Sequence, residues 1–282
     1  MSPIDRRALF SSGAAAALLA ATGVSLAASP RTGGRLRLAV PREDDSLISL
    51  VRGAGFETLT EIAPNGVLQG ELATGWTASA NAKTWQFELR RGVAFHDGRA
   101  MRAQDVVSSL QMHDATGHIR IETVRATDSH RIRLDLAEGN PDLPILLADT
   151  RLIICADGQV DVPLAAAIGT GCYRTDRFAQ DRQYLGGKIQ DHYKAGRAGW
   201  VDSIEVAVIP DAAVRAEALR DGFVDIAVLP MAQALRGQDN LTFHPSADDM
   251  AFAASTTVGV PRVIGSRSPL DDGRLAQRWW KG

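Results

Sequence analysis

The chain has 282 residues, which is enough for one large domain or two small ones with a sizeable core. Its 31 lysine and arginine residues nearly balance 33 aspartate and glutamate residues, which excludes the strongly basic surface of a nucleic-acid-binding protein and a polyanion partner. The hydrophobic content of 45% is ordinary for a soluble globular protein.

Residues 1–30 have the character of an export signal peptide rather than of a folded element. Arg6 and Arg7 precede a mild apolar run that ends in small residues, which predicts cleavage near Ala27–Ser29. The arginine pair resembles a twin-arginine signal, and an ordinary secretory signal is the alternative. Because the run is short and rich in alanine, a membrane anchor is disfavoured. The sequence therefore predicts a periplasmic protein.

The early part of the mature chain shows two strands and one helix. In residues 35–40 and 85–89 every second residue is apolar, which is the period of a half-buried strand. An apolar stripe in residues 106–110 predicts a short helix. Residues 41–55, between the first strand and the next recognisable segment, are interpreted as a loop.

The middle of the chain is predicted to contain further strands around a short helix. Residues 119–121 and 132–136 have strand periodicity. The two prolines of residues 140–149 predict a turn that leads into a short helix. The apolar residues 151–155 are expected to form a short buried strand.

Residues 204–229 carry the clearest local pattern. A strand at 204–209 precedes Asp211, a predicted helix N-cap, and Gly222 ends the helix before a strand at 224–229. A unit of this size predicts parallel pairing of the two strands through a right-handed crossover. The apolar stripe of the helix is predicted from three residues: Val214, Ala218 and Leu219. Its charged residues are expected to form a solvated face: Arg215, Glu217, Arg220 and Asp221.

The exact amino-acid sequence of residues 56–110 says more about the protein family than their periodicity does. The segment contains, in order, FETLTEIAPNG, ELATGW, NAKTWQFELRRGVAFHDG and AQDVVSSL. It resembles the signature region of the family 5 extracellular solute-binding proteins, the peptide, nickel and opine receptors of ABC importers. A second block consists of GTGCYR at 169–174 and residues 203–229. It resembles the next signature segment of that family and lies at the expected distance along the chain from the first.

The resemblance implies a fold class and a division into lobes. The implied class is α/β, similar to the type II periplasmic binding proteins but truncated, with mixed sheets and flanking helices. A first lobe would consist of residues 33–55 and 169–265, and residues 56–168 would form an inserted second lobe that does not clamp the ligand. Residues 266–282 resemble the sequence motif at the start of the family's other ligand-binding lobe. We expect that lobe to be missing.

The resemblance also implies a function without enzymatic activity or a cofactor. The protein would bind a peptide or a similar small solute and hand it to an ABC transporter permease in the inner membrane. One alternative is a periplasmic interaction protein that docks onto a partner or a second copy through Trp279 and Trp280. A fragment without function is the other alternative.

Candidate ligand-binding residues lie in two places. Phe56, Glu57 and Thr58 follow the predicted loop, where a carboxylate could meet a cationic ligand group; Glu57 could equally be a helix-start carboxylate favoured by the dipole. The resemblance places Gly171 in a hinge turn, after which Tyr173 could present its ring and hydroxyl to a cleft. Tyr173 could equally be a packed strand residue.

Neither a metal site nor a catalytic nucleophile is indicated. His113 and His118 are five residues apart and lack partners at metal-ligand spacing, and the chain has no GxSxG motif. Cys155 and Cys172 could form one disulfide in an oxidising compartment or remain two buried thiols.

Overall fold

The computed structural model describes most of the chain after the predicted export signal. The described residues are 30–42, 45–179, 181–230, 239–245, 250–261 and 273–282. Arg6, Arg7 and the predicted cleavage region lie outside them. Within these ranges, no helix combines the length and the apolar character that a bilayer-spanning segment needs.

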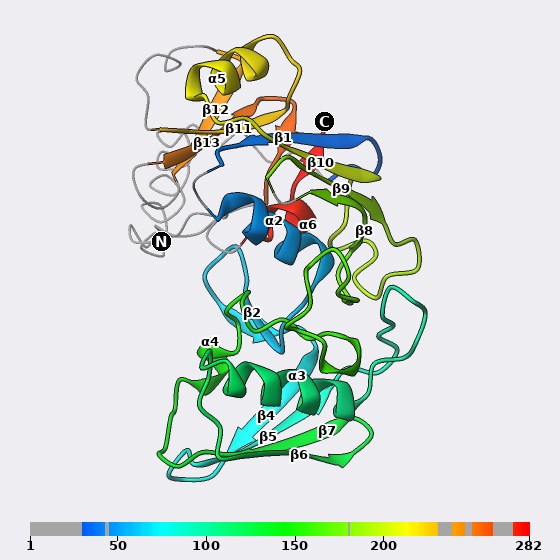
Figure 1. The fold of residues 1–282 in the computed structure, drawn as a ribbon, viewed down its shortest axis with the longest axis vertical. Helices are drawn as coiled ribbons and strands as arrows, with labels where there is room; N and C mark the ends of the chain where they lie inside the picture. Colours follow the sequence, from blue (N-terminus) through cyan, green and yellow to red (C-terminus); the bar gives the residue numbers. More distant parts are fainter. Residues whose placement is uncertain (1–29, 43–44, 180, 231–238, 246–249, 262–272) are drawn as a thin grey trace, which may run out of the picture.

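The larger lobe is built on a seven-stranded sheet with the order β12-β13-β11-β1-β10-β9-β8 (Figure 1). Its strands are β1 Arg35–Val40, β8 Tyr173–Ala179, β9 Gln183–Lys188, β10 Ser203–Val208, β11 Ile226–Pro230, β12 Leu241–Pro245 and β13 Met250–Ser255. The strand predicted at 35–40 is confirmed and is central, with β10 parallel on one side and β11 parallel on the other. The two strands of the 204–229 unit therefore do not pair with each other, because β1 lies between them.

Helices cover both faces of this sheet. Helices α2 (Ser46–Gly55) and α6 (Leu275–Arg278) pack on one face, and α5 (Ala212–Arg220) packs on the other (Figure 1). The prediction of a loop over 41–55 is wrong for the part that forms α2. The buried residues of that helix recur with helical spacing: Leu47, Leu50, Val51 and Ala54.

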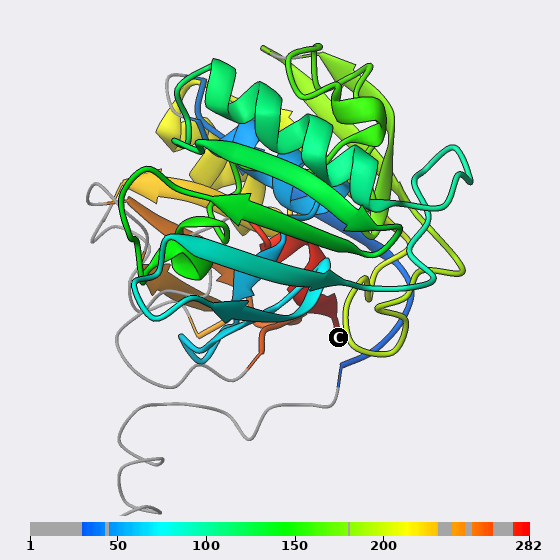
Figure 2. The ribbon, with the colours of Figure 1, turned by 90° about the horizontal axis from the view of Figure 1, so that it is seen from below.

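The smaller lobe is a four-stranded antiparallel sheet covered by one helix. The strands, in spatial order, are β4 Ala73–Ala78, β5 Thr84–Leu89, β7 Arg131–Asp135 and β6 Thr123–Asp128. Helix α3 (Ala103–Ala115) lies along them (Figure 2). The strand predicted at 85–89 and the helix predicted at 106–110 are confirmed, since their apolar residues form the core of this lobe. The two strands predicted between residues 119 and 136 are present, but the first, β6, begins at Thr123 rather than at Ile119, and the second is β7.

Several short elements complete the fold. They are the hairpin β2 Thr60–Ile62 with β3 Leu68–Gly70, helix α4 Leu143–Leu146, the 3-10 turn Ala156–Gly158, and, in the larger lobe, the pair β14 Val258–Gly259 with β15 Trp280–Lys281. Helix α4, which contains Pro144 in its first turn, confirms the short helix predicted within residues 140–149. The strand predicted at 151–155 is wrong: these residues form a loop in which Ile154 donates its backbone N–H to the Glu57 carbonyl at 2.9 Å.

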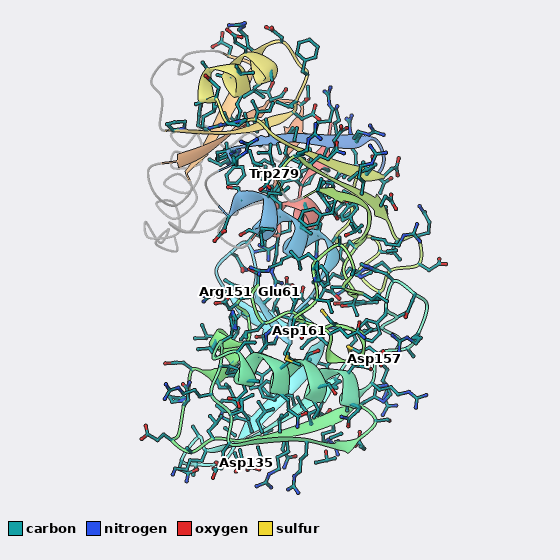
Figure 3. All side chains as sticks on the ribbon, in the orientation of Figure 1. Glu61, Asp135, Arg151, Asp157, Asp161 and Trp279 are labelled. Atoms are coloured by element: carbon teal, nitrogen blue, oxygen red, sulfur yellow. The ribbon has the colours of Figure 1, made fainter. Side chains whose placement is uncertain are left out.

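The end of the chain packs against the larger lobe. Trp279 exposes none of its surface and Trp280 only 3%, and Trp279 lies in the core beside α2 and β1 (Figure 3). Residues 273–282 therefore form part of the larger lobe. Docking through the tryptophan pair is contradicted, because neither ring is available to a partner.

Candidate functional site

The residues predicted to meet a ligand lie in the interior of this structure. Phe56, Glu57, Thr58 and Tyr173 each expose 4% of their surface or less. Gly171 lies so close to α2 that a Cβ there would come within 2.5 Å of the Ala54 carbonyl oxygen. The side chains of these residues thus contribute to packing between elements rather than to an open surface.

Glu57 belongs to a network of buried charges between the lobes. Its Oε1 accepts a hydrogen bond of 2.7 Å from the Tyr193 hydroxyl and lies 2.8 Å from Lys194 Nζ. The same Lys194 Nζ lies 2.5 Å from Oε1 of Glu71, which follows β3. Lys194 lies in the loop after β9 and exposes 8% of its surface. One lysine from the larger lobe therefore joins two carboxylates that lie 14 residues apart in the chain.

Arg274, at the start of α6, joins the opposite side of the network. Its Nη1 lies 2.8 Å from Glu71 Oε2 and 3.0 Å from Glu61 Oε2, and its Nη2 donates to Thr58 Oγ1 at 2.8 Å. Arg278 Nη2 lies 3.3 Å from Glu61 Oε2. Glu61 accordingly lies in the region between the two lobes (Figure 3). We call these six charged residues the inner network: Glu57, Glu61, Glu71, Lys194, Arg274 and Arg278.

Electrostatics keep the centre of the inner network ionised. Burial alone would raise the pKa of Glu71, but the charges of Arg274 and Lys194 hold it at about 2. Burial alone would lower the pKa of Lys194, but Glu57 and Glu71 raise it well above its ordinary value. A buried charge is tolerated when it is paired and hydrogen-bonded. The network is therefore a set of interdependent contacts that fixes the lobes relative to each other.

A pocket of about 620 Å³ lies over the outer side of the inner network. This volume is within the range of roughly 300–1,000 Å³ that is typical of small-molecule sites. Three of its lining residues are aromatic: Tyr193, Trp200 and Trp280. Four are cationic: Arg90, Lys194, Arg197 and Arg278. Cations beside aromatic rings make this pocket the candidate functional site.

Tyr193 positions the two cations that do not belong to the inner network. The guanidinium carbon of Arg90 lies 5.0 Å from the centre of the Tyr193 ring, and Arg90 Nε donates to the Glu71 carbonyl at 2.9 Å. Arg197 Nη2 donates to the Tyr193 carbonyl at 3.2 Å. Because the Tyr193 hydroxyl is itself held by Glu57, the ring is fixed at both ends. We call Arg90 and Arg197 the rim arginines.

Sequence reasoning missed both the inner network and the rim arginines. Lys194 and Glu71 are 123 residues apart, and Arg274 and Glu71 are 203 residues apart. No periodicity or spacing rule connects residues at such separations. The local sequence around Lys194, DHYKA at 191–195, has no apolar run that would predict a buried lysine or its ion pairs.

The two cysteines do not form a disulfide in the structure; both are buried free thiols. Cys155 packs with Phe56 and Ile153, whereas Cys172 lies in the core of the larger lobe. Burial raises the pKa of each thiol to about 12, so both are held in their unreactive protonated form. Within the described ranges, no three His, Cys, Asp or Glu residues are grouped so that they could hold a metal ion.

The model of the bacterial extracellular solute-binding proteins, family 5 middle, matches residues 67–274. The chain belongs to this family. The match confirms the resemblance stated from the sequence motifs, and it covers most of both lobes as well as the segment that supplies Lys194 and Arg274.

Curated relatives of the family 5 chain include receptors and regulators. Di/tripeptide-binding protein 2 of Pseudomonas aeruginosa is 28% identical over 260 residues, which cover 78% of this chain and 47% of the relative. The HTH-type transcriptional regulator SgrR of Salmonella choleraesuis is 28% identical over 160 residues, which cover 55% of this chain and 28% of the regulator. The chain thus spans about half the length of the di/tripeptide-binding relative.

Solved structures share the fold over a similar extent. The periplasmic binding protein DppA of Helicobacter pylori, in complex with the peptide STSA, has a TM-score of 0.65 at 23% identity, covering 76% of this chain and 50% of that one. AgaA of A. tumefaciens R10, in complex with agropinic acid, has a TM-score of 0.67 at 24% identity, covering 75% and 48%. These likenesses confirm the predicted fold class, a type II-like α/β fold that corresponds to about half of each neighbour.

Proposed function

We propose that this family 5 protein is a periplasmic receptor that binds a peptide or a similar small solute and delivers it to an ABC transporter permease. The observation that carries the proposal is the family match over residues 67–274. The names of the relatives support it, since one binds di- and tripeptides and a solved neighbour holds a peptide. The pocket between the lobes supplies a site of suitable size.

The pocket binds a solute through a rigid floor and aromatic walls. The inner network forms the floor, and its paired charges do not have to reorganise when a ligand arrives. Trp200 offers apolar surface to the body of the ligand, while the rim arginines offer hydrogen-bond donors. We expect a dissociation constant in the micromolar to millimolar range, equivalent to about 4–8 kcal/mol.

The alternative role as an interaction protein has lost its main support. It depends on an exposed tryptophan pair, and both Trp279 and Trp280 are buried. The exposed large apolar side chains of the described residues are instead scattered over the surface: Val67, Ile145, Leu146, Val214 and Phe223. Single exposed apolar residues are normal for a monomer and indicate no docking surface.

Native mass spectrometry of the protein purified from the periplasm of its own host tests the proposal. We expect a monomer that carries a reproducible small adduct, and fragmentation of that adduct would identify the solute. Titration calorimetry with di- and tripeptides provides a second measurement. Trp200→Ala should weaken binding because it removes a wall of the pocket.

Phe223→Ala is the matched control for the pocket variant. Phe223 is 71% exposed and follows α5, on the opposite face of the seven-stranded sheet from α6. Its removal should leave binding unchanged. A protein that carries no adduct and binds no peptide at millimolar concentration would contradict the receptor function, as would equal effects of the two variants.

A further inference from the structure

The carboxylates that line the pocket are already engaged by the protein. Glu61 contacts Arg274 and Arg278, and its Oε1 accepts a hydrogen bond from Gln69 Nε2 at 2.6 Å. Glu71 contacts Lys194 and Arg274. An incoming ammonium group would have to compete with these cations for the same oxygens. Among the described residues, the pocket therefore offers no unoccupied carboxylate to a cationic ligand group.

The rim arginines, unlike these carboxylates, are not paired with a group of opposite charge among the described residues. Arg90 donates its Nε to a backbone carbonyl and stacks on Tyr193, and Arg197 donates one Nη2 to a backbone carbonyl. Across the parts of the chain that the structure describes, neither guanidinium pairs with a carboxylate. Arg90 is partly buried, so its charge is less screened than that of a fully exposed arginine. Each of the two retains N–H donors for an external acceptor.

The rings set the shape of the remaining surface. Trp200, which is partly exposed, lines the same pocket as the rim arginines, whereas Trp280 shows it only the 3% of its surface that is exposed, and Arg90 stacks on the Tyr193 ring. Flat apolar walls favour a flat ligand body, because offset stacking adds to the burial of apolar area. The pocket thus combines a cationic rim with an aromatic wall, and among its described lining residues the four cations outnumber the carboxylates Glu61 and Glu71 by two.

We propose that this pocket selects small organic anions, specifically a carboxylate on a flat apolar body that has no free ammonium group. The rim arginines bind the carboxylate, and Trp200, which is partly exposed, holds the body. This inference rests on the proposed solute-binding function and refines it, because a zwitterionic peptide would leave its ammonium group without a partner. A buried charge without a partner weakens binding substantially.

Three probes that share the tryptophan side chain but differ in their charged groups test this inference. N-acetyltryptophan carries only the carboxylate, N-acetyltryptophanamide carries no charge, and free tryptophan carries both a carboxylate and an ammonium group. In titration calorimetry at low salt we expect the acid to bind at least about tenfold more tightly than either of the others, as for one charge-assisted hydrogen-bonded contact. Affinity for the acid should fall as ionic strength rises.

Arg197→Gln and Arg90→Gln identify the groups responsible. Each should lower the affinity for the acid by about tenfold and shrink its advantage over the amide. Arg91→Gln is the matched control, because Arg91 is an exposed neighbour of Arg90 that does not line the pocket. Circular dichroism checks the fold of each variant, and Arg197, being exposed, provides a test even if Arg90→Gln is unstable.

The outcomes separate this inference from the proposed function. Equal binding of acid and amide, or preference for free tryptophan, would overturn the anion selectivity while supporting solute binding. Binding of peptides or a native adduct without binding of the acid would have the same meaning. Failure of every probe, every peptide and the adduct search would overturn both proposals. Unchanged acid affinity in both rim variants would refute the assigned role of the arginines.

Discussion

The inner network and the rim arginines lie side by side but differ in how their charges are satisfied. Lys194 exposes 8% of its surface and contacts Glu57 and Glu71. Arg197, three residues later in the same loop, is exposed, and the one polar contact of its guanidinium among the described residues is to a backbone carbonyl. Two cations from one loop therefore have different surroundings, and we infer that they have different roles.

The difference follows from the physics of buried charge. Removing a charged side chain from water costs several kcal/mol, so a buried cation persists only where carboxylates surround it. An exposed arginine needs no such partner and remains available to a ligand. We therefore expect substitutions in the inner network to change stability and substitutions at the rim to change binding.

Lys194→Met should have the largest effect on stability. The change leaves Glu57 and Glu71 buried with one cation fewer, and breaking a buried ion pair from one side costs about 3–5 kcal/mol. Chemical denaturation followed by circular dichroism measures the free energy of unfolding. Arg197→Met is the matched control, and it should change that energy by less than about 0.5 kcal/mol. Similar losses for the two variants would remove the distinction between network and rim.

The pH dependence of stability sharpens the same comparison. The folded-state pKa of Glu71 is about 2, below its ordinary value of 4.5, because Arg274 and Lys194 outweigh the effect of burial. Such a group stabilises the protein fully above pH 4.5, and its contribution is lost as the pH falls through 2. The contribution is about 3 kcal/mol. Acid should therefore destabilise the protein.

Glu71→Gln isolates this contribution, because glutamine does not titrate. The unfolding free energy of the variant should fall less steeply between pH 5 and about 2 than that of the natural chain. Other acidic groups with lowered pKa values, such as Asp149 and Asp225, are present in both proteins and cancel in the difference. Parallel pH curves would show that Glu71 does not depend on the two cations.

The sequence predicted those features whose signals are local. The N-cap at Asp211 is confirmed, since its side chain accepts hydrogen bonds from the backbone of Ala213 and Val214. The strands predicted at 35–40, 85–89 and 132–136, whose apolar residues alternate, are confirmed as β1, β5 and β7. Helix α2 was missed although Leu47, Leu50 and Val51 have helical spacing, because the acidic segment before them was interpreted as part of a loop.

Long-range contacts explain the remaining errors. Arg215 is expected to face solvent on helical spacing alone, yet it exposes 2% and donates to the carbonyls of Ile209, Pro210 and Val228. Val214, expected in the apolar stripe, is 48% exposed. The burial of Arg215 and the exposure of Val214 both depend on how α5 lies over the ends of β10 and β11. A pattern within one helix cannot specify that placement.

Gly53→Ala tests how closely the end of the chain packs on α2. A Cβ at Gly53 would lie 2.3 Å from the Gly273 carbonyl oxygen and 2.8 Å from the Arg274 nitrogen, so the segment that positions Arg274 would have to shift. Alanine is favoured over glycine within a helix by about 0.5–1 kcal/mol, but overpacking typically costs about 1–3 kcal/mol. We expect net destabilisation in thermal or chemical unfolding.

Gly75→Ala is the control for this substitution. Gly75 lies in β4 with no atom within 4 Å of a Cβ added there. Its replacement should change the free energy of unfolding by less than about 0.5 kcal/mol. Equal stability of Gly53→Ala and the natural chain would indicate that the contact between α2 and Gly273 is looser than the structure shows.

Arg131→Gln should have the smallest effect and sets the scale for an exposed pair. Arg131 Nη2 lies 2.9 Å from Glu88 Oε1 across β5 and β7, but both side chains are about half exposed. Such pairs contribute about 0.2–1 kcal/mol, because water and salt screen the attraction. Unfolding in low and high salt should show a loss in this range that shrinks as salt rises. A loss as large as that of Lys194→Met would mean that burial does not separate strong from weak ion pairs in this fold.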